Sequence, residues 1–306
     1  MADTEDIAAN APARVFSHLS RGTTYESYQR YYEAKGLRTY LLRSALAPFS
    51  SWRWNRFITS CHARVGAPPP LARVLAKPLR SYLCAGLGPR QRVATLIEGY
   101  ECLEARFNAG FLARFCAGDK MPLFSFEARK GARFTLFCSA TVDQALQREG
   151  EIALFLVKAD PEVTLCRIAT TFAKVDGKVT MTIGGLQGPQ SAHKRDVIDS
   201  TREMYGLRPK DAALLVARAF AQAAGAEALH AVSDANHVLA RLQDTAKFSS
   251  YDAYWLERGA SAGGPYGFIF PPLGDDDADD SKRSALKRSL IEATRAFVRA
   301  NGRNEA

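Results

Sequence analysis

The front of the chain has the hydrophobic spacing of helices. Over residues 23–118, apolar positions recur every three or four residues, which is the period of one helix face. Breaks come at Pro48, at residues 68–70 and at residues 86–89, where proline and glycine interrupt helices. The pattern predicts a helical N-terminal section over residues 23–118, preceded by a disordered N-terminus over residues 1–22.

After Gly118 the spacing changes to that of strands. Five short runs rich in β-branched and aromatic residues follow one another, separated by turn signals. The runs are LFSFEAR, ARFTLFCSA, EIALFLVKA, TLCRIATTFA and KVTMTIGG. The clearest turn is Asp176-Gly177, a pair that favours tight hairpins. The pattern predicts a mostly antiparallel meander of about five strands.

A second helical region follows the meander. The sequence predicts a short helix over residues 194–205 and another from Pro209 to Ala224, since proline suits the first turn of a helix and Gly225 suits its C-terminal cap. A buried strand is predicted at EALHAVSD, then another short helix. Residues 251–270 are rich in aromatics and glycine, which predicts a packed irregular segment with one strand at GFIF.

The tail has its own pattern. An acidic run occupies residues 275–280, and from Ser281 an amphipathic helix begins. Its apolar face carries Leu286, Leu290, Ile291, Phe297 and Val298. Such a helix docks on its own domain, on a partner or on a membrane surface. The predicted fold class is thus α+β, with a mostly antiparallel sheet and flanking helices in one domain over residues 119–273 and a tail over residues 274–306.

Composition narrows the class of protein only a little. With 306 residues and 47% hydrophobic content, the chain can bury a substantial core. Its net charge of +9 favours acidic partners without choosing among them. Six cysteines form no CxxC pair, so neither a zinc site nor a disulfide framework is indicated. The first residues do not resemble a signal peptide and no run reaches the ~20 apolar residues of a membrane span, so we expect a cytoplasmic protein.

Residues 180–210 are the best candidates for ligand binding. Gly184, Gly185 and Gly188 allow the backbone to approach a ligand closely, and Arg208 and Lys210 place positive charge at a helix start, where N–H groups are unpaired. The order of strand, glycine turn, basic helix start, long helix, buried strand and asparagine resembles the central part of a GNAT acyltransferase. Alternatively, the basic residues only begin a helix.

This resemblance implies a donor and a set of residues that bind it. The donor is an acyl thioester of phosphopantetheine, on coenzyme A or on an acyl or peptidyl carrier protein, with no tightly bound cofactor. The residues that the resemblance places at the donor are Gln187, Gly188, Arg208, Lys210 and Asn236.

Two residues are candidates for proton transfer. His237 has a side chain suited to a general base, and Tyr251 has one suited to protonating a leaving thiolate. The competing interpretations are a structural histidine and an aromatic core residue. Glu149 and Glu151 flank Gly150, where one of them would serve as a base if buried, but a solvated turn is favoured. His230 and His237 have no third ligand at a metal-binding spacing, so no metal site is predicted.

Aromatic residues near the front raise other possibilities. Tyr25, Tyr28, Tyr31 and Tyr32 have helical spacing, which favours packing over ligand stacking. Trp52 and Trp54 flank Arg53, with Arg56 following, a mixture that suits nucleic acid or a lipid headgroup. No nucleic-acid-reading motif accompanies them, so nucleic-acid binding is disfavoured.

Four separated blocks resemble a known family. They are IGGLQGP from Ile183, YGLRPK from Tyr205, VSDANH from Val232 and YDAYW from Tyr251. In this order they are similar to the VirK/YbjX family of Gram-negative bacteria over residues 77–272. The resemblance implies a link to virulence and to tolerance of antimicrobial peptides, with no settled biochemical activity. Where the family has a His-Tyr pair, this chain has Gly99-Tyr100. The alternative to an acyltransferase is a non-catalytic adaptor or regulator in envelope remodelling.

Overall fold

The computed structural model describes residues 38, 40–141, 146–189, 193–240, 250–274 and 281–303. The predicted disordered N-terminus, the tyrosine cluster at residues 25–32 and the acidic run at residues 275–280 lie outside these ranges. Most of the short helix predicted after residue 238 also lies outside them.

The front of the described chain is helical, as predicted. Its elements are α4 (Pro48–Arg64), α5 (Ala72–Leu75), the 3-10 turn η1 (Lys77–Leu79), α6 (Pro89–Arg106) and α7 (Ala109–Ala117). Proline opens α4 and α6, where a missing N–H costs little. Asn108 caps α7 by accepting a 2.9 Å hydrogen bond from the Phe111 N–H, and Gly118 ends that helix with a φ of 82°.

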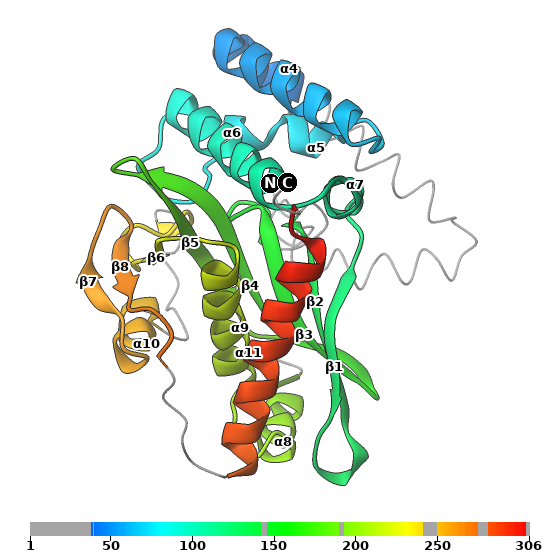
Figure 1. The fold of residues 1–306 in the computed structure, drawn as a ribbon. Helices are drawn as coiled ribbons and strands as arrows, with labels where there is room; N and C mark the ends of the chain where they lie inside the picture. The colour runs from blue at the N-terminus through cyan, green and yellow to red at the C-terminus, as the bar shows by residue number, and fades with distance from the viewer. Residues whose placement is uncertain are drawn as a thin grey trace, which may run out of the picture.

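Eight strands form one sheet in the order β1-β2-β3-β4-β5-β6-β8-β7 (Figure 1). The strands are β1 (Met121–Glu127), β2 (Arg133–Ala140), β3 (Ile152–Ala159), β4 (Glu162–Val175), β5 (Lys178–Gln187), β6 (Ala228–Val232), β7 (Ser261–Gly263) and β8 (Gly267–Phe270). The first five form the predicted antiparallel meander. At the predicted hairpin, Asp176 and Gly177 both have positive φ. Strand β6 then pairs parallel with β5, and β8 lies between β6 and β7.

The connection from β5 to β6 contains the two predicted helices, α8 (Lys194–Glu203) and α9 (Pro209–Ala223). Helix α9 lies across one face of the sheet and buries its small apolar stripe there (Figure 1). It ends as predicted: Gly225 has a φ of 72°, and the Ala226 N–H donates to the Ala221 carbonyl oxygen at 2.9 Å.

The segment 251–270 is more regular than predicted. The strand predicted at GFIF is β8, but the segment also contains a helix, α10 (Tyr251–Glu257), and the strand β7, so the irregular part of the prediction was wrong. Ser250 caps α10 by accepting a 3.2 Å hydrogen bond from the Ala253 N–H. Trp255 is fully buried and donates its indole N–H to the Val232 carbonyl oxygen at 2.9 Å. Packing against β6 therefore organises a sequence that local spacing alone leaves ambiguous.

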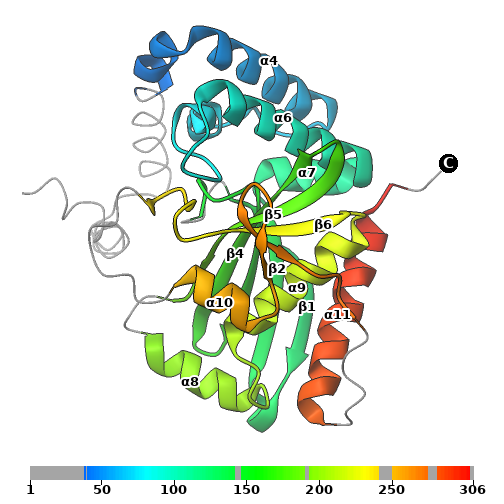
Figure 2. The same cartoon turned by 90° about the vertical axis from the view of Figure 1, so that its left-hand side faces the viewer.

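The predicted tail helix, α11 (Lys282–Asn301), docks on its own domain. It runs beside α9 in both views (Figures 1 and 2). Leu286, Leu290 and Val298 are buried, so the apolar face is used within the molecule. The Asn108 N–H donates to the Asn301 carbonyl oxygen at 2.9 Å, which ties the end of α11 to the start of α7.

The front helices and the sheet share one hydrophobic core. Helix α6 approaches β4 closely because Gly99 lacks a side chain; a Cβ there would lie 3.1 Å from the Phe172 carbonyl oxygen. Among the described helices, none combines the length and the hydrophobicity that crossing a bilayer requires.

Candidate functional site

The segment from Glu149 to Glu151 runs against the backbone of β4 and β5. A Cβ on Gly150 would lie 2.6 Å from the Thr170 carbonyl oxygen. A Cβ on Gly184 would overlap the Glu149 carbonyl oxygen, and one on Gly185 would overlap the Glu149 carboxylate. Three glycines are therefore needed for this contact. The sequence interpretation of Gly184 and Gly185 needs correction, since the group that approaches them is Glu149 of the same chain.

Strand β5 is irregular at this contact. Ala169 pairs with Gly185 and Thr170 pairs with Ile183, so Gly184 is an extra residue, a β-bulge. The parallel pairing of β5 with β6 also stops at Ile183. Beyond that point the Tyr251 hydroxyl hydrogen-bonds to the backbone of β5 in place of a strand. It accepts from the Leu186 N–H at 3.1 Å and donates to the Leu186 carbonyl oxygen at 3.2 Å.

Glu149 is buried, and only one of its two carboxylate oxygens accepts a hydrogen bond from the described part of the chain. Its Oε1 accepts a 3.1 Å hydrogen bond from Gln187 Nε2 and lies 3.3 Å from His237 Nε2. Its Oε2 is buried without a hydrogen-bond partner among the described residues. Glu149 and Glu151 are each 2% exposed, so the solvated turn favoured by the sequence is wrong. A buried carboxylate oxygen without a partner is costly, and such groups mark functional sites.

His237 faces Glu149 from the loop after β6. The 3.3 Å approach of its Nε2 to Glu149 Oε1 has the distance of an ion pair but not the alignment of a hydrogen bond. Its Nδ1 accepts a 3.4 Å hydrogen bond from the Leu239 N–H. This arrangement places the ring proton on Nε2, towards Glu149. Both ring nitrogens thus have neighbours within the protein, whereas Glu149 Oε2 is buried against Gly185 without a hydrogen-bond partner among the described residues.

Tyr251 completes the cluster. Its ring centroid lies 5.2 Å from that of His237, edge to face. Burial and, after it, the negative charge of Glu149 raise the pKa of Tyr251 well above the ordinary tyrosine value. The phenol therefore keeps its proton at neutral pH.

The other predicted donor residues divide into two groups. Asn236 is used structurally: its side-chain amide donates to the Tyr266 carbonyl oxygen at 3.2 Å, and its own carbonyl oxygen accepts from the Ala85 N–H at 2.9 Å. Gly188, Arg208 and Lys210 meet at the start of α9, where a Cβ on Gly188 would lie 3.6 Å from Lys210 Cε. Arg208 is exposed, and partial burial lowers the pKa of Lys210.

These two places adjoin at the end of β5. The side chain of Gln187 turns to Glu149, and the next residue, Gly188, lies beside Lys210. The structure therefore brings Gln187, His237 and Tyr251 together around Glu149 and leaves the basic helix start as a neighbouring site.

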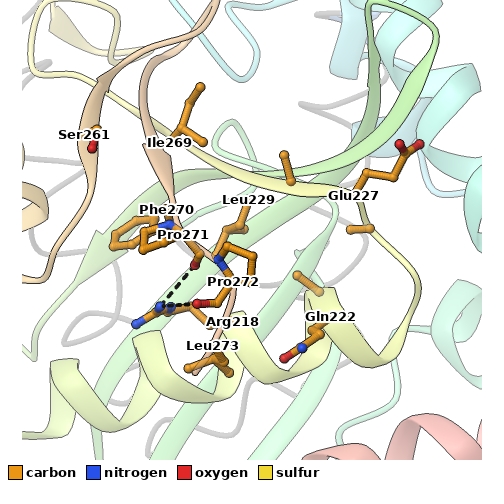
Figure 3. A pocket seen from close by; sticks show the side chains of 13 residues that line it. Arg218, Gln222, Glu227, Leu229, Ser261, Ile269, Phe270, Pro271, Pro272 and Leu273 are labelled. Atoms are coloured by element: carbon orange, nitrogen blue, oxygen red, sulfur yellow. Dashed lines mark hydrogen bonds between the residues drawn. The ribbon is translucent and has the colours of Figure 1, made fainter. Parts of the chain in front are cut away.

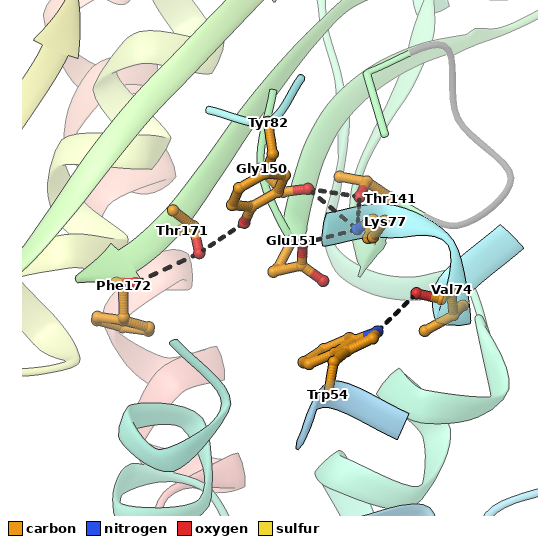
Figure 4. Close-up of polar contacts among 9 residues, drawn as sticks. All are labelled: Trp54, Val74, Lys77, Tyr82, Thr141, Gly150, Glu151, Thr171 and Phe172. Carbon is orange, nitrogen blue, oxygen red and sulfur yellow. Dashed lines mark hydrogen bonds and ion pairs between the residues drawn. The ribbon is translucent and has the colours of Figure 1, made fainter. Parts of the chain in front are cut away.

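Glu151 belongs to a second buried cluster (Figure 4). Lys77 Nζ lies 2.7 Å from Glu151 Oε1 and also donates to Thr141 Oγ1 at 3.0 Å and to the Gly150 carbonyl oxygen at 3.3 Å. Tyr82 is fully buried nearby, and burial raises its pKa. Because Lys77 supplies both charge and hydrogen bonds, the role of Glu151 is structural.

A pocket of about 460 Å³ lies elsewhere, between the C-terminal half of α9 and β6 and β8 (Figure 3). None of the predicted site residues lines it. Arg218 donates to the carbonyl oxygens of Pro271 and Pro272 at 3.1 and 3.4 Å, so its charge is engaged within the wall. In the described part of the chain, no three acidic, histidine or cysteine side chains cluster in a way that would hold a metal ion.

Sequence reasoning missed the central position of Glu149. Two features of the sequence could have indicated it. Gly150 stands alone between two acidic residues, and the later strand contains two consecutive glycines, Gly184 and Gly185. Glycines facing each other in this way indicate a close backbone crossing.

The crossing is testable with one methyl group. Gly184→Ala should lower the free energy of unfolding by about 3 kcal/mol or more, because the new Cβ overlaps a backbone carbonyl that cannot rotate away. Gly86→Ala is the matched control, since a Cβ there meets nothing within 4 Å. Urea unfolding measures both; equal stabilities for the two variants would contradict the crossing.

The buried ion pair is testable by a double-mutant cycle. Lys77→Met or Glu151→Leu should each cost about 3–5 kcal/mol of unfolding free energy, because each leaves a buried charge without its partner. The double variant should cost much less than the sum of the two. The exposed Arg64–Glu104 pair at 2.6 Å is the control, with an expected coupling below about 1 kcal/mol. Additive losses at Lys77 and Glu151 would show that the two side chains do not interact.

Comparison with known proteins gives a family and no activity. Residues 30–284 match the family described as "Protein of unknown function (DUF535)". The chain is also 27% identical over 250 residues to the uncharacterized protein YbjX of Escherichia coli strain K12, an alignment that covers 79% of this chain and 73% of that protein. No solved structure matches the chain. The chain therefore belongs to the DUF535 family of proteins of unknown function, the VirK/YbjX family indicated by its four sequence blocks.

Proposed function

We propose that this protein is an acyltransferase that moves an acyl or aminoacyl group from a phosphopantetheine thioester to an amine or hydroxyl. The observation that carries the proposal is the convergence of Gln187, His237 and Tyr251 on Glu149 at the bulge in β5. A buried carboxylate, an imidazole and a protonated phenol in contact provide the groups that acyl transfer needs.

The order of elements supports the same proposal. Strand β5 leads through the Gly188 turn and α8 to α9, and β6 returns parallel to β5. Asn236 follows β6. This is the order on which the GNAT resemblance rests, and the reactive cluster lies where β5 and β6 cease to pair.

Glu149 is the base in this proposal. Gln187 and His237 flank Oε1, while Oε2 is packed against Gly185 without a hydrogen-bond partner among the described residues. The proposal requires this contact to open so that Oε2 can take a proton from the acceptor. The acceptor nitrogen or oxygen attacks the thioester carbonyl carbon, its proton passes to Glu149 Oε2, and the C–S bond breaks. Tyr251 gives its proton to the departing thiolate, and return of the proton from Glu149 restores both groups. His237, assigned by sequence as the base, becomes a positioning residue.

The basic start of α9 is suited to the phosphate end of the donor. Lys210 makes no ion pair within 4 Å with a described residue, and Arg208 is exposed at the cap position. Unpaired N–H groups and nearby cations at a helix start attract phosphate. A donor lying along the end of β5 would have its phosphates here and its thioester towards Glu149.

The second candidate is a non-catalytic adaptor or regulator in the envelope, in which the Glu149 cluster only stabilises the fold. Glu149 and His237 are each 2% exposed, and the Tyr251 hydroxyl already has two partners on Leu186. A cluster that serves only to stabilise the fold would look the same in these respects. The two candidates differ in whether the protein binds and cleaves a thioester.

Thiol release decides between them. The purified protein is incubated with acetyl-coenzyme A, longer acyl-coenzyme A or a loaded carrier protein, together with an amine acceptor, and free thiol is followed with a thiol reagent. Glu149→Gln should lower the rate about 100-fold or more, because the amide keeps the shape and cannot take the proton. Lys210→Ala should weaken binding of coenzyme A in calorimetry with a smaller effect on the maximal rate.

The control is Glu162→Gln, which changes an exposed carboxylate at the start of β4 and should leave the rate unchanged. Circular dichroism and urea unfolding establish that the variants fold. Absence of thiol release together with absence of coenzyme A binding would reject the acyltransferase in favour of the adaptor. Full activity of Glu149→Gln would reject the assigned base.

A further inference from the structure

The positive charge of this chain is concentrated in one segment. Residues 34–97 contain no aspartate or glutamate, and they contain eleven lysines and arginines: Lys35, Arg38, Arg43, Arg53, Arg56, Arg64, Arg73, Lys77, Arg80, Arg90 and Arg92. This segment contributes +11 to a net charge of +9, so the rest of the chain carries −2. The segment therefore carries positive charge without any acidic residue of its own to offset it.

Helix α4 presents the outermost side of this segment. It lies beyond α6, away from the sheet, in both views (Figures 1 and 2). Its inner side buries Trp54, Ile58 and Cys61 completely. Its outer side carries Phe49 and Trp52, 81% and 62% exposed, together with the exposed cations of the next turn.

Exposed hydrophobic side chains gather at the same place. Of the seven large hydrophobic side chains that are exposed in the described part of the chain, five lie within residues 41–52. They are Leu41, Leu42, Leu46, Phe49 and Trp52. The other two, Ile198 and Leu256, are single residues far along the chain. Scattered apolar residues need no explanation, but a gathered set marks an interaction site.

Cations surround these side chains. Arg38, Arg43, Arg53 and Arg56 are exposed within the same stretch, and the Arg56 guanidinium lies 5.6 Å from the Trp52 ring centroid. A groove of about 550 Å³ between residues 46–50 and residues 88–91 places Arg90 beside Leu46 and Phe49. We call these exposed side chains the α4 face: Arg38, Leu41, Leu42, Arg43, Leu46, Phe49, Trp52, Arg53 and Arg56.

We propose that the α4 face docks this protein on the surface of an anionic lipid bilayer. Arginines meet the lipid phosphates, while leucine, phenylalanine and tryptophan side chains enter the boundary between headgroups and acyl chains. The exposed cations beside these side chains orient the protein with α4 towards the lipid.

The chemistry of the face favours lipid over nucleic acid. Nucleic acid is bound by cations and by aromatic stacking, which Phe49 and Trp52 alone would supply. Three leucines, 59–86% exposed, would stay in water in such a complex, whereas a bilayer buries them. The face also differs from α11, for which the sequence left a membrane surface open as one of three alternatives, because the apolar side of α11 is already packed against α9.

Trp52 is a built-in reporter of docking. Trp54 and Trp255, the other two tryptophans, are both 0% exposed, so a change in solvent-accessible tryptophan fluorescence reports Trp52. The full-length protein is mixed with vesicles of phosphatidylcholine containing phosphatidylglycerol, and with vesicles of phosphatidylcholine alone. We expect a blue shift, protection from iodide quenching and co-sedimentation with the anionic vesicles, all reduced by added salt.

Two paired variants test the two halves of the α4 face. Arg53→Glu/Arg56→Glu and Leu42→Ser/Phe49→Ser should each weaken vesicle binding about tenfold or more. All four side chains are exposed, so folding should be preserved. The matched controls, Arg129→Glu/Arg133→Glu and Ile198→Ser/Leu256→Ser, change exposed cations and exposed hydrophobics elsewhere and should bind as the unaltered protein does.

Three results would overturn the proposal. One is failure of the unaltered protein to bind anionic vesicles. Another is equal weakening by the control pairs, which would show that no particular face is used. The third is salt-sensitive binding of duplex DNA, lost in Arg53→Glu/Arg56→Glu, by a protein that ignores vesicles, since that would assign the same face to nucleic acid.

Discussion

Two carboxylates separated by one glycine are buried in this protein, and their need for partners organises much of the fold. An unpaired charge in the interior costs several kcal/mol, so each acid must meet a cation or hydrogen-bond donors. Glu151 meets Lys77 from the front helices. Glu149 meets Gln187 from β5 and His237 from the loop after β6. The segment around Gly150 thereby joins the front, the middle and the end of the chain.

The two acids then diverge in character. The Lys77 ammonium donates hydrogen bonds to Glu151, to Thr141 and to the Gly150 carbonyl oxygen. All of its donors are therefore used within the protein, and we assign that cluster a structural role. Glu149 retains one oxygen without a partner in the described residues, beside a bulge and a strand edge held by Tyr251. The acyltransferase proposal rests on this difference. The membrane proposal rests on the exposed side of α4, so either stands if the other fails.

The spacing of hydrophobic residues along the chain was sufficient to predict the strands β1–β5 and the helices α8 and α9. In these elements the hydrophobic period and the turn residues lie close together in the sequence. The spacing failed for α10, whose aromatic residues are ordered by packing of Trp255 on β6. It also failed for Glu149 and Glu151, since burial depends on partners far along the chain; Lys77 lies 74 residues before Glu151. Chemical character did single out His237 and Tyr251, and the GNAT resemblance singled out Gln187; the structure places the three together. Glycine pairs were correctly noticed but assigned to a ligand instead of to Glu149.

The central claim is that the Nε2 side of His237 faces Glu149 Oε1, while Glu149 Oε2 has no hydrogen-bond partner among the described residues. The nitrogen chemical shifts of the imidazole ring, assigned by loss of the signals in His237→Gln, test it most directly. The account predicts a bare Nδ1 that accepts from the Leu239 N–H and a proton on Nε2, with the Nε2 signal displaced in Glu149→Gln. A proton on Nδ1, or two signals that average as in an imidazole free in solvent, would contradict the account.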